Sequence, residues 1–247
     1  MRFLLYNIAY GTGSPRSASH HVFTMHRYLR TPHHHFEAIR DFVIRQRPDI
    51  VGLVEVDNGS VRFGRRNQVS ELARDLSHEH SWGRKYGNGA FTRYLPILRH
   101  QGNALLARGP LRQVSHHFFE RGFKRLIVEV TVDDIQLYLV HLALNERIRG
   151  MQLRYLTELI GTTAQPVILA GDFNIFQGRR ELAHLMKETG LRNPNTGRRP
   201  TYPSWGPRRE LDLILCSPAI SVRRFHIFDD ILLSDHLPLL VDFAASS

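Results

Sequence analysis

The sequence predicts an α/β protein in which two packed sheets carry helices on their outer faces. Segments with apolar residues at helical spacing alternate with short apolar runs that are typical of strands. Four strand-like segments between residues 103 and 142 are divided by short polar turns, which favours antiparallel hairpins. The outline of strand, loop, helix and further strands occurs twice, which favours two halves that pack against each other.

The first half of the chain begins with an apolar strand and a long loop rich in Gly, Ser, Arg and His. Apolar residues at helical spacing then predict two amphipathic helices. The continuous apolar run between these helices is typical of a strand buried on both faces. In chain order we expect a strand at 2–7, a loop at 9–32, a helix at 33–46, a strand at 49–56, a helix at 67–78 and strands at 103–108, 112–119, 124–132 and 135–142.

The second half repeats this pattern. Apolar residues at helical spacing predict a first helix, and Gly190 ends a second one. A loop rich in Pro, Gly and Arg precedes the last strands. In chain order we expect a helix at 147–161, a strand at 166–170, a helix at 179–189, a loop at 193–209 and strands at 211–216, 220–228 and 237–243. No linker divides the pattern, so residues 1–247 are predicted to form a single domain.

Composition indicates a globular chain rather than a disordered one. Hydrophobic residues make up 42% of the sequence, which is enough to bury a core. The single cysteine, Cys216, excludes an internal disulfide and is predicted to be a small buried residue. No apolar stretch approaches the ~20 residues needed to cross a bilayer. We therefore expect a cytoplasmic protein without a transmembrane segment, for which membrane contact would be peripheral.

The chain is strongly basic, with a formal net charge of +10 and a pI near 10.3. Such a charge attracts polyanions: nucleic acid, anionic lipid headgroups or phosphorylated small molecules. Charge alone does not choose among these ligands, and a merely solubilising surface is the alternative. Nothing in the sequence indicates an obligate protein partner.

Several polar residues stand at the ends of the predicted apolar strands. Burying a carboxylate there is costly unless it is paired or binds a metal. One such acid is usually a cap or turn residue, but ligands of α/β sheets bind in the crevice beyond strand ends. The convergence of several therefore predicts a site. These residues are Asn7, Glu55, His141, Asp172, Asn174, Asp212, Asp235 and His236.

Seven segments that include these residues occur in the order found in one known group of enzymes. The segments are Tyr6-Asn7-Ile8, Val54-Glu55-Val56, Gly102-Asn103-Ala104-Leu105-Leu106, Val140-His141-Leu142, Gly171-Asp172-Phe173-Asn174, Leu211-Asp212-Leu213-Ile214 and Ser234-Asp235-His236-Leu237-Pro238. The set resembles the endonuclease/exonuclease/phosphatase superfamily of deoxyribonucleases, abasic-site endonucleases, inositol polyphosphate phosphatases and neutral sphingomyelinases. The resemblance implies a four-layered α/β sandwich, with two packed and mostly antiparallel sheets flanked by helices.

The resemblance also implies a divalent cation, Mg²⁺ or alternatively Mn²⁺. Glu55 would be the main metal ligand, with Asn7 and Asp235 near the same ion. Hard oxygen ligands and few protein contacts suit Mg²⁺, which keeps several waters and takes phosphate oxygens from a substrate. The implied enzyme is a metal-dependent phosphoric ester hydrolase.

The remaining strand-end residues would carry the proton transfers and the stabilisation of charge. Asp172 would orient or deprotonate the attacking water, and Asn174 would donate to the phosphate oxygens. His236, held by Asp212, would act as general base or as a donor in the transition state. His141 would protonate or stabilise the leaving oxygen.

One position separates the chain from the abasic-site branch of this superfamily. Those enzymes carry an acid two residues after the first Asn, where this chain has Ala9. They also lack a histidine at the position of His141. Both differences favour the deoxyribonuclease and sphingomyelinase branches over repair of abasic sites.

Basic loops flank the predicted site. Arg179 and Arg180 follow Asn174 and are predicted to bind the substrate, because guanidinium forks suit phosphate oxygens. Asn103 matches a superfamily position near the substrate phosphate, the alternative being a turn residue at the start of a strand.

Three functions remain in competition at the level of sequence. The first is a phosphodiesterase that acts as an endonuclease or exonuclease on DNA or RNA. The second is a phospholipid or inositol-headgroup phosphodiesterase or phosphatase, similar to sphingomyelinases or to proteins that remodel GPI lipids. The third is a basic nucleic-acid-binding protein with an inactive site, against which the complete set of site residues argues.

Overall fold

The structure is a computed structural model that describes residues 1–14, 31–85 and 95–245 of the chain. Part of the loop predicted at 9–32 therefore lies outside the described residues. The strands are β1 (Arg2–Asn7), β2 (Ile50–Asp57), β3 (Glu79–Arg84), β4 (Gln101–Ala107), β5 (Arg112–Phe118), β6 (Leu126–Val132), β7 (Ile135–His141), β8 (Val167–Asp172), β9 (Asp212–Cys216), β10 (Ile220–Ile227) and β11 (Leu239–Ala245). The α-helices are α2 (His33–Gln46), α3 (Gln68–Leu76), α4 (Glu146–Gly161) and α5 (Ala183–Thr189).

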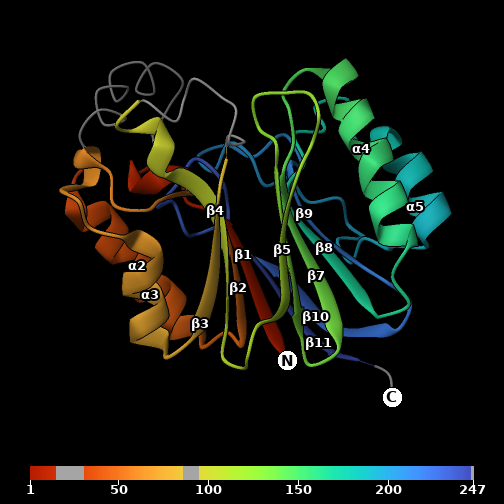
Figure 1. Ribbon diagram of the computed structural model, residues 1–247, viewed down its shortest axis with the longest axis horizontal. Coiled ribbons are helices and arrows are strands. Elements are labelled where there is room, and N and C mark those ends of the chain that lie inside the picture. The colour runs from red at the N-terminus through yellow and green to blue at the C-terminus, as the bar shows by residue number, and fades with distance from the viewer. Residues whose placement is uncertain (15–30, 86–94, 246–247) are drawn as a thin grey trace.

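These elements form four layers, which confirms the predicted α/β sandwich (Figure 1). Within the described residues, one sheet has the strand order β10-β11-β1-β2-β4-β3 and the other has the order β5-β6-β7-β8-β9. Helices α2 and α3 cover the outer face of the first sheet, and α4 and α5 cover that of the second (Figure 1). No helix in the described parts of the chain is both long and apolar enough to cross a membrane.

The apolar run in β1 shows why the strands near the middle of the sheet read as continuously hydrophobic. Phe3 and Leu5 pack into the core between the two sheets. Leu4 and Tyr6 alternate with them and pack under the helices of the outer layer. A strand that is buried on both faces needs apolar side chains at every position.

Two neighbouring pairs of described strands are parallel, and they define where polar strand ends meet. In the pair of β1 and β2, Asn7 is in register with Val54. In the pair of β7 and β8, His141 is in register with Asp172. Parallel strands end at the same edge of a sheet, so both sheets deliver their polar residues to one end of the sandwich.

The structure differs from the predicted elements at two places. Strand β3 is absent from the prediction because its inward residues, Ser81 and Gly83, are too small to give an alternating apolar pattern. The helix predicted at 179–189 is a 3-10 turn over Arg179–Leu182 followed by the short α5. Helical periodicity does not distinguish these two kinds of turn over so few residues.

Gly171 permits an unusually close approach of β7 and β8 just before Asp172. Its φ is +146°, and a Cβ atom built on it would lie 1.9 Å from the carbonyl oxygen of Val140. Backbone atoms cannot move aside as the end of a flexible side chain can. This glycine is therefore required for the sheet to form next to the catalytic candidates.

We predict that Gly171→Ala lowers the free energy of unfolding by more than about 4 kcal/mol, which is in the exceptional range for one substitution. Gly178→Ala is the matched control. Gly178 also has a positive φ, +81°, but no neighbouring atom lies within 4 Å of the position that a Cβ atom would take there. The control should cost only the backbone strain, about 1–3 kcal/mol. Urea denaturation followed by circular dichroism measures both values, and equal losses would contradict the steric explanation.

Candidate active site

Seven of the eight predicted strand-end residues line one cavity of about 140 Å³ at the end of the sandwich where the parallel strands terminate. The first sheet supplies Asn7 and Glu55, and the second supplies His141 and Asp172. Asp212 lies behind His236 and does not line the cavity. The lining is completed by Lys124, Leu144, Asn174, Phe176, Tyr202, Leu211, Asp235 and His236.

The Asp172 carboxylate is the centre of the cluster. Asn7 Nδ2 donates to its Oδ2 atom over 3.1 Å, and the backbone N–H of Asn174 donates to Oδ1 over 3.1 Å. His141 Nε2 lies 3.2 Å from Oδ2 and His236 Nε2 lies 3.9 Å from it. Although burial opposes the charged form, the two histidines hold the pKa of Asp172 well below its usual range.

His236 is held by Asp212. The Nδ1 atom of His236 lies 2.8 Å from Asp212 Oδ2, and Thr201 Oγ1 donates to the same oxygen over 2.7 Å. The ring of Tyr202 packs against the imidazole with 4.7 Å between centroids. Burial opposes the charged imidazole, but the negative charges of Asp212 and Asp172 raise the pKa of His236 to about 10.

His141 has the opposite electrostatic environment. It is buried, and its Nε2 atom contacts the ammonium group of Lys124. Burial and the charge of Lys124 together lower the pKa of His141 to about 4, against the opposing effect of Asp172. The cavity therefore contains one histidine that its surroundings hold in the charged form and one that they hold neutral.

A β-bulge places Glu55 in the cavity. The register between β2 and β4 shifts between Leu53 and Val56, and Glu55 has a φ of 58°. Leu53 and Val56 both pack under the helices, which two residues three apart in a regular strand could not do. The bulge thus removes Glu55 from the alternation, and the side chain of Asn103 accepts its backbone N–H over 3.2 Å.

Lys85 pairs with Glu55 and was not predicted. Its Nζ atom lies 2.8 Å from Glu55 Oε1 and donates to the hydroxyl of Tyr10 over 2.7 Å. Burial opposes the Glu55 carboxylate, but the charges of Lys85, His141 and Lys124 hold its pKa below the usual range. Lys85 directly follows β3, so recognition of that strand would have placed this lysine at the same end of the sheet.

Glu55 and two neighbouring residues carry the oxygen atoms that a divalent cation would need. Glu55, Asp235 and the amide of Asn7 line the same cavity and supply hard ligands. Burial and the charge of Glu55 raise the pKa of Asp235. In the described parts of the chain Asp235 has no ion pair, its carboxylate accepting a bond from Ser234 Oγ over 3.2 Å. A cation beside these carboxylates would relieve their mutual repulsion.

A second group of ligand atoms lies beside the first. Asp172, Asp212 and His236 each offer one ligand atom, and these atoms lie within 4.8 Å of one another. The imidazole is already bonded to Asp212 in this arrangement. The all-oxygen set around Glu55 matches Mg²⁺ better than this mixed set does, because Mg²⁺ prefers oxygen ligands.

The structure places the three predicted substrate-binding residues outside the cavity lining. Arg179 makes two bonds of 2.6 Å with the carboxylate of Glu210, so its guanidinium fork is already paired. Arg180 Nη2 donates to Gln177 Oε1 over 3.0 Å on the outside of the 3-10 turn. Asn103 is buried and supports the backbone of Glu55. The prediction that Arg179 binds the substrate is therefore corrected, because its guanidinium is engaged by Glu210. The sequence does not reveal this partner, which lies 31 residues away.

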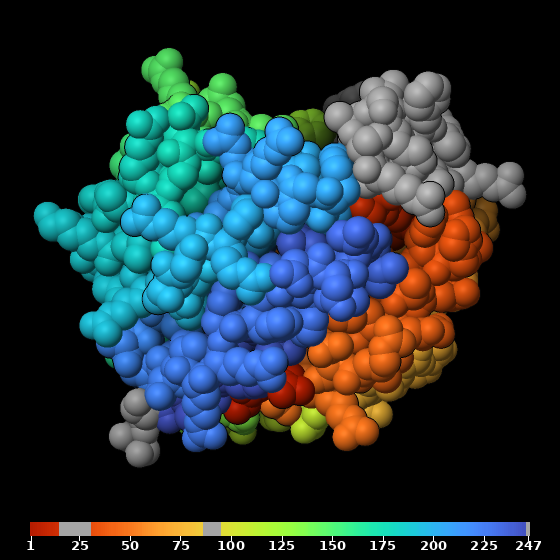
Figure 2. Space-filling model, turned by 180° about the vertical axis from the view of Figure 1, so that it is seen from behind, coloured from red at the N-terminus to blue at the C-terminus, as the bar shows by residue number. Residues whose placement is uncertain are grey.

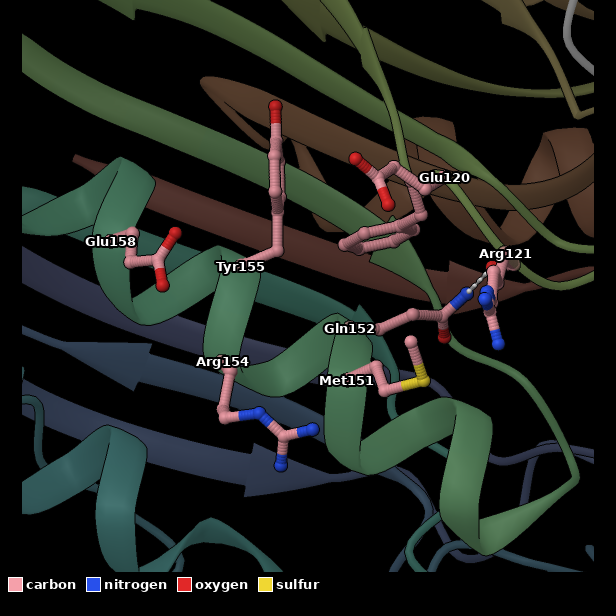
Figure 3. A pocket seen from close by; sticks show the side chains of 8 residues that line it. Glu120, Arg121, Met151, Gln152, Arg154, Tyr155 and Glu158 are labelled. Carbon is pink, nitrogen blue, oxygen red and sulfur yellow. Dashed lines mark hydrogen bonds between the residues drawn. The ribbon is translucent and has the colours of Figure 1, made fainter.

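Gln152 of α4 joins the two loops that carry His141 and Lys124. Its Nε2 atom donates to the carbonyl oxygens of Lys124 (2.8 Å) and Arg121 (3.2 Å), and its Oε1 atom accepts from the backbone of Ala143 (2.8 Å). Figure 3 shows Gln152 reaching from the helix to Arg121 beside a groove of about 250 Å³. The helix therefore positions the histidine and the lysine relative to each other.

Comparison with known proteins identifies the family to which the sequence belongs. The sequence pattern of the Endonuclease/Exonuclease/phosphatase family matches residues 4–236. No curated protein matches the chain.

Solved structures match over nearly the whole chain at low sequence identity. An endonuclease/exonuclease/phosphatase from Beutenbergia cavernae has a TM-score of 0.71 at 20% identity, over 100% of this chain and 72% of the other. The human Nocturnin catalytic domain with bound sulfate has a TM-score of 0.68 at 19% identity, over 100% of this chain and 93% of the other. A 3'-5' exonuclease from Neisseria meningitidis has a TM-score of 0.67 at 15% identity, over 98% of this chain and 99% of the other. These likenesses establish a shared fold.

Replacing Gln152 with Met should preserve volume while leaving buried backbone groups of Ala143 and Lys124 unpaired. We predict a loss of about 1–3 kcal/mol in the free energy of unfolding for each unpaired group. For any reaction at this site we predict a fall in kcat of about tenfold to a hundredfold with little change in KM. Gln165→Met is the control. Equal kcat values for the two variants would contradict a positioning role.

Proposed function

The chain belongs to the Endonuclease/Exonuclease/phosphatase family and is a phosphoric ester hydrolase, and we propose that it cleaves phosphodiester bonds of DNA or RNA with the help of Mg²⁺. The observation that carries this proposal is the convergence of residues from both sheets on Asp172. The Oδ2 atom of that carboxylate lies within 4 Å of the Nε2 atoms of two histidines, in a cavity that also holds the carboxylates of Glu55 and Asp235.

A nucleic acid is the substrate class that the surroundings of the cavity favour. The ammonium group of Lys124 lines the cavity, where it attracts an anionic diester. Tyr202 and Phe176 line the same cavity and offer aromatic faces to a base. The net charge of +10 adds long-range attraction for a polyanion. The Neisseria exonuclease, which shares the fold, is named for the same class of substrate.

The attack of water on the phosphate is assigned to Asp172 and His236. Asp172, held in its charged form, orients the water and accepts its proton, and the charged His236, fixed by Asp212, donates to the negative charge that develops on the phosphate. Asn174 donates to the phosphate oxygens, since the bond from its Nδ2 to the carbonyl of Leu142, 2.9 Å long, fixes the orientation of its amide. Mg²⁺ held by the oxygen atoms around Glu55 would supply Lewis-acid stabilisation of the same charge.

The leaving oxygen is assigned to His141 and Lys124. These two side chains contact each other at the cavity, and His141 Nε2 also lies 3.2 Å from Asp172 Oδ2. The ammonium of Lys124 can stabilise the charge that develops as the P–O bond breaks, while His141 keeps Lys124 in place. The sequence did not single out Lys124, because one lysine at the start of a strand has no distinguishing pattern.

The purified protein should hydrolyse a single-stranded DNA or RNA oligonucleotide with Mg²⁺ or Mn²⁺ and should lose this activity in EDTA. His236→Ala should lower kcat by about 10²–10³ through loss of a donor to the developing charge. A gel assay measures cleavage of plasmid DNA and single-stranded RNA, and headgroup release measures hydrolysis of sphingomyelin and phosphoinositides. Hydrolysis of lipid substrates alone would overturn the choice of nucleic acid, and full activity in EDTA would overturn the metal requirement.

Lys124→Met should lower kcat by about 10²–10³ on a dinucleotide, the usual loss for a donor to developing charge. The loss should be much smaller on bis(p-nitrophenyl) phosphate, because p-nitrophenolate is a stable leaving group that needs little assistance. Lys187→Met, on the exposed side of α5, is the control and should retain full activity on both substrates. Equal losses on the two substrates would contradict the role at the leaving oxygen.

A further inference from the structure

A second concave site lies at the end of the sheets opposite the candidate active site. It is a hollow of about 460 Å³, and five of its nine lining residues are arginines. Arg2 begins β1 and Asn7 ends it, so the two sites are separated by about 17 Å of strand at 3.3 Å per residue. The lining residues are Met1, Arg2, Arg47, Asp49, Arg108, Arg223, Arg224, Asp242 and Phe243. We call this site the arginine hollow.

Figure 2 shows the surroundings of the arginine hollow from behind. Residues of the N-terminus, in red, are visible at the lower edge between the blue C-terminal strands and the orange segment that contains α2. The hollow thus collects side chains from five places in the sequence. None of the nine lining residues belongs to the lining of the candidate active site.

A β-bulge directs two consecutive arginines into the arginine hollow. In a regular strand, neighbouring residues point to opposite faces of the sheet. The register between β10 and β11 shifts between Val222 and Arg224, which leaves Arg223 as the extra residue. Arg223 and Arg224 consequently line the same hollow. Bulges that re-aim side chains are typical of functional sites.

A second backbone irregularity brings in another arginine. Arg47 follows the last residue of α2 and has a left-handed conformation, with a φ of 47° and a ψ of 53°. Glycine or asparagine usually occupies this position after a helix, because a larger side chain is strained there. The strain is borne by a residue whose guanidinium lines the arginine hollow.

The arginine hollow has more positive charge than its own carboxylates neutralise. Arg2 pairs with Asp242 over 2.8 Å, and Arg108 pairs with Asp49 over 2.9 Å. Within the described ranges, the other three arginines of the hollow have no ion pair and are exposed at the surface. They are Arg47, Arg223 and Arg224. Three exposed guanidinium groups therefore line one concave surface without a carboxylate of their own.

We propose that the arginine hollow binds the phosphate groups of a compact polyphosphate, a ligand distinct from the ester cleaved at the other end of the sheets. Guanidinium groups bind phosphate oxygens in pairs through their planar forks. The volume lies in the range of small-molecule sites, about 300–1,000 Å³. The proposal stands independently of the proposed function, because it concerns binding at a separate set of residues.

Isothermal titration calorimetry with inorganic tripolyphosphate, in EDTA and at 0.1 M salt, tests the proposal directly. The double variant Arg223→Ser, Arg224→Ser should bind tripolyphosphate at least about tenfold more weakly than the wild-type chain, since two guanidinium groups that can bond to phosphate oxygens are lost. Arg47→Gly is a second variant that removes a guanidinium while relieving backbone strain. It should also weaken binding without loss of thermal stability.

A charge-matched control separates this site from general attraction to a basic protein. Arg147→Ser, Arg154→Ser removes two exposed arginines from α4, where Figure 3 shows Arg154, and neither residue lines the arginine hollow. This control should bind tripolyphosphate within about twofold of the wild type, because salt at this strength screens distant charges. All three variants should hydrolyse bis(p-nitrophenyl) phosphate at the wild-type rate.

Three outcomes would overturn the proposal. The first is equal weakening in the Arg223, Arg224 variant and in the α4 control, which would indicate charge alone. The second is unchanged binding in both hollow variants, which would place tripolyphosphate elsewhere. The third is loss of binding in the hollow variants only for a 20-nucleotide single strand or for phosphatidylglycerol vesicles, which would assign the hollow to a polymer or a membrane.

Discussion

The buried carboxylate of Asp172 is the group on which the arrangement of this protein depends. Moving a carboxylate out of water is expensive, and the cost is recovered here only because four neighbours from different parts of the chain donate to it or lie beside it. Asn7 comes from the first sheet, while His141 comes from the second. The two sheets must therefore pack with their polar strand ends together, or the charge would remain unpaired.

The same end of the sandwich concentrates backbone conformations that L-residues rarely adopt. Glu55 has a φ of 58° and Asn174 a φ of 51°, and Gly171, next to Asp172, has a φ of +146°. For a residue other than glycine, such a conformation costs about 1–3 kcal/mol, so the surrounding core must hold Glu55 and Asn174 in place. In return the bulge directs Glu55 into the cavity, and the turn at Asn174 sends its N–H to Asp172.

The electrostatics of the cavity depend on groups from distant segments rather than on any one residue. Two histidines in one cavity are driven to opposite states, because Asp212 faces His236 whereas Lys124 faces His141. Lys85 similarly keeps Glu55 charged despite its burial. Positive groups thus occur both at the cavity, where Lys124 lines it, and in the arginine hollow at the opposite end of the sheets.

The sequence by itself determined the positions of most helices and strands and the identity of most of the residues that line the cavity. Core-facing runs such as 2–7 and 49–56 must be apolar to be buried, so their positions can be read directly, and the polar residues that end them are conspicuous for the same reason. Strand β3 escaped because an edge strand that packs Ser81 and Gly83 inward needs no apolar pattern. A local sequence pattern indicates which residues are buried, but it does not indicate which residues they pack against.

Only the tertiary structure decided which polar groups become partners. Arg179 was predicted to bind substrate, but it is paired with Glu210. Lys85 and Lys124 had no recognisable pattern, yet they face Glu55 and His141. Partners of this kind are brought together by the packing of strands and loops that are far apart in the chain, and a contact across 30 residues leaves no periodicity in the sequence. The physical reason is that charge pairing acts through space, whereas sequence patterns record only the local repeat of the backbone.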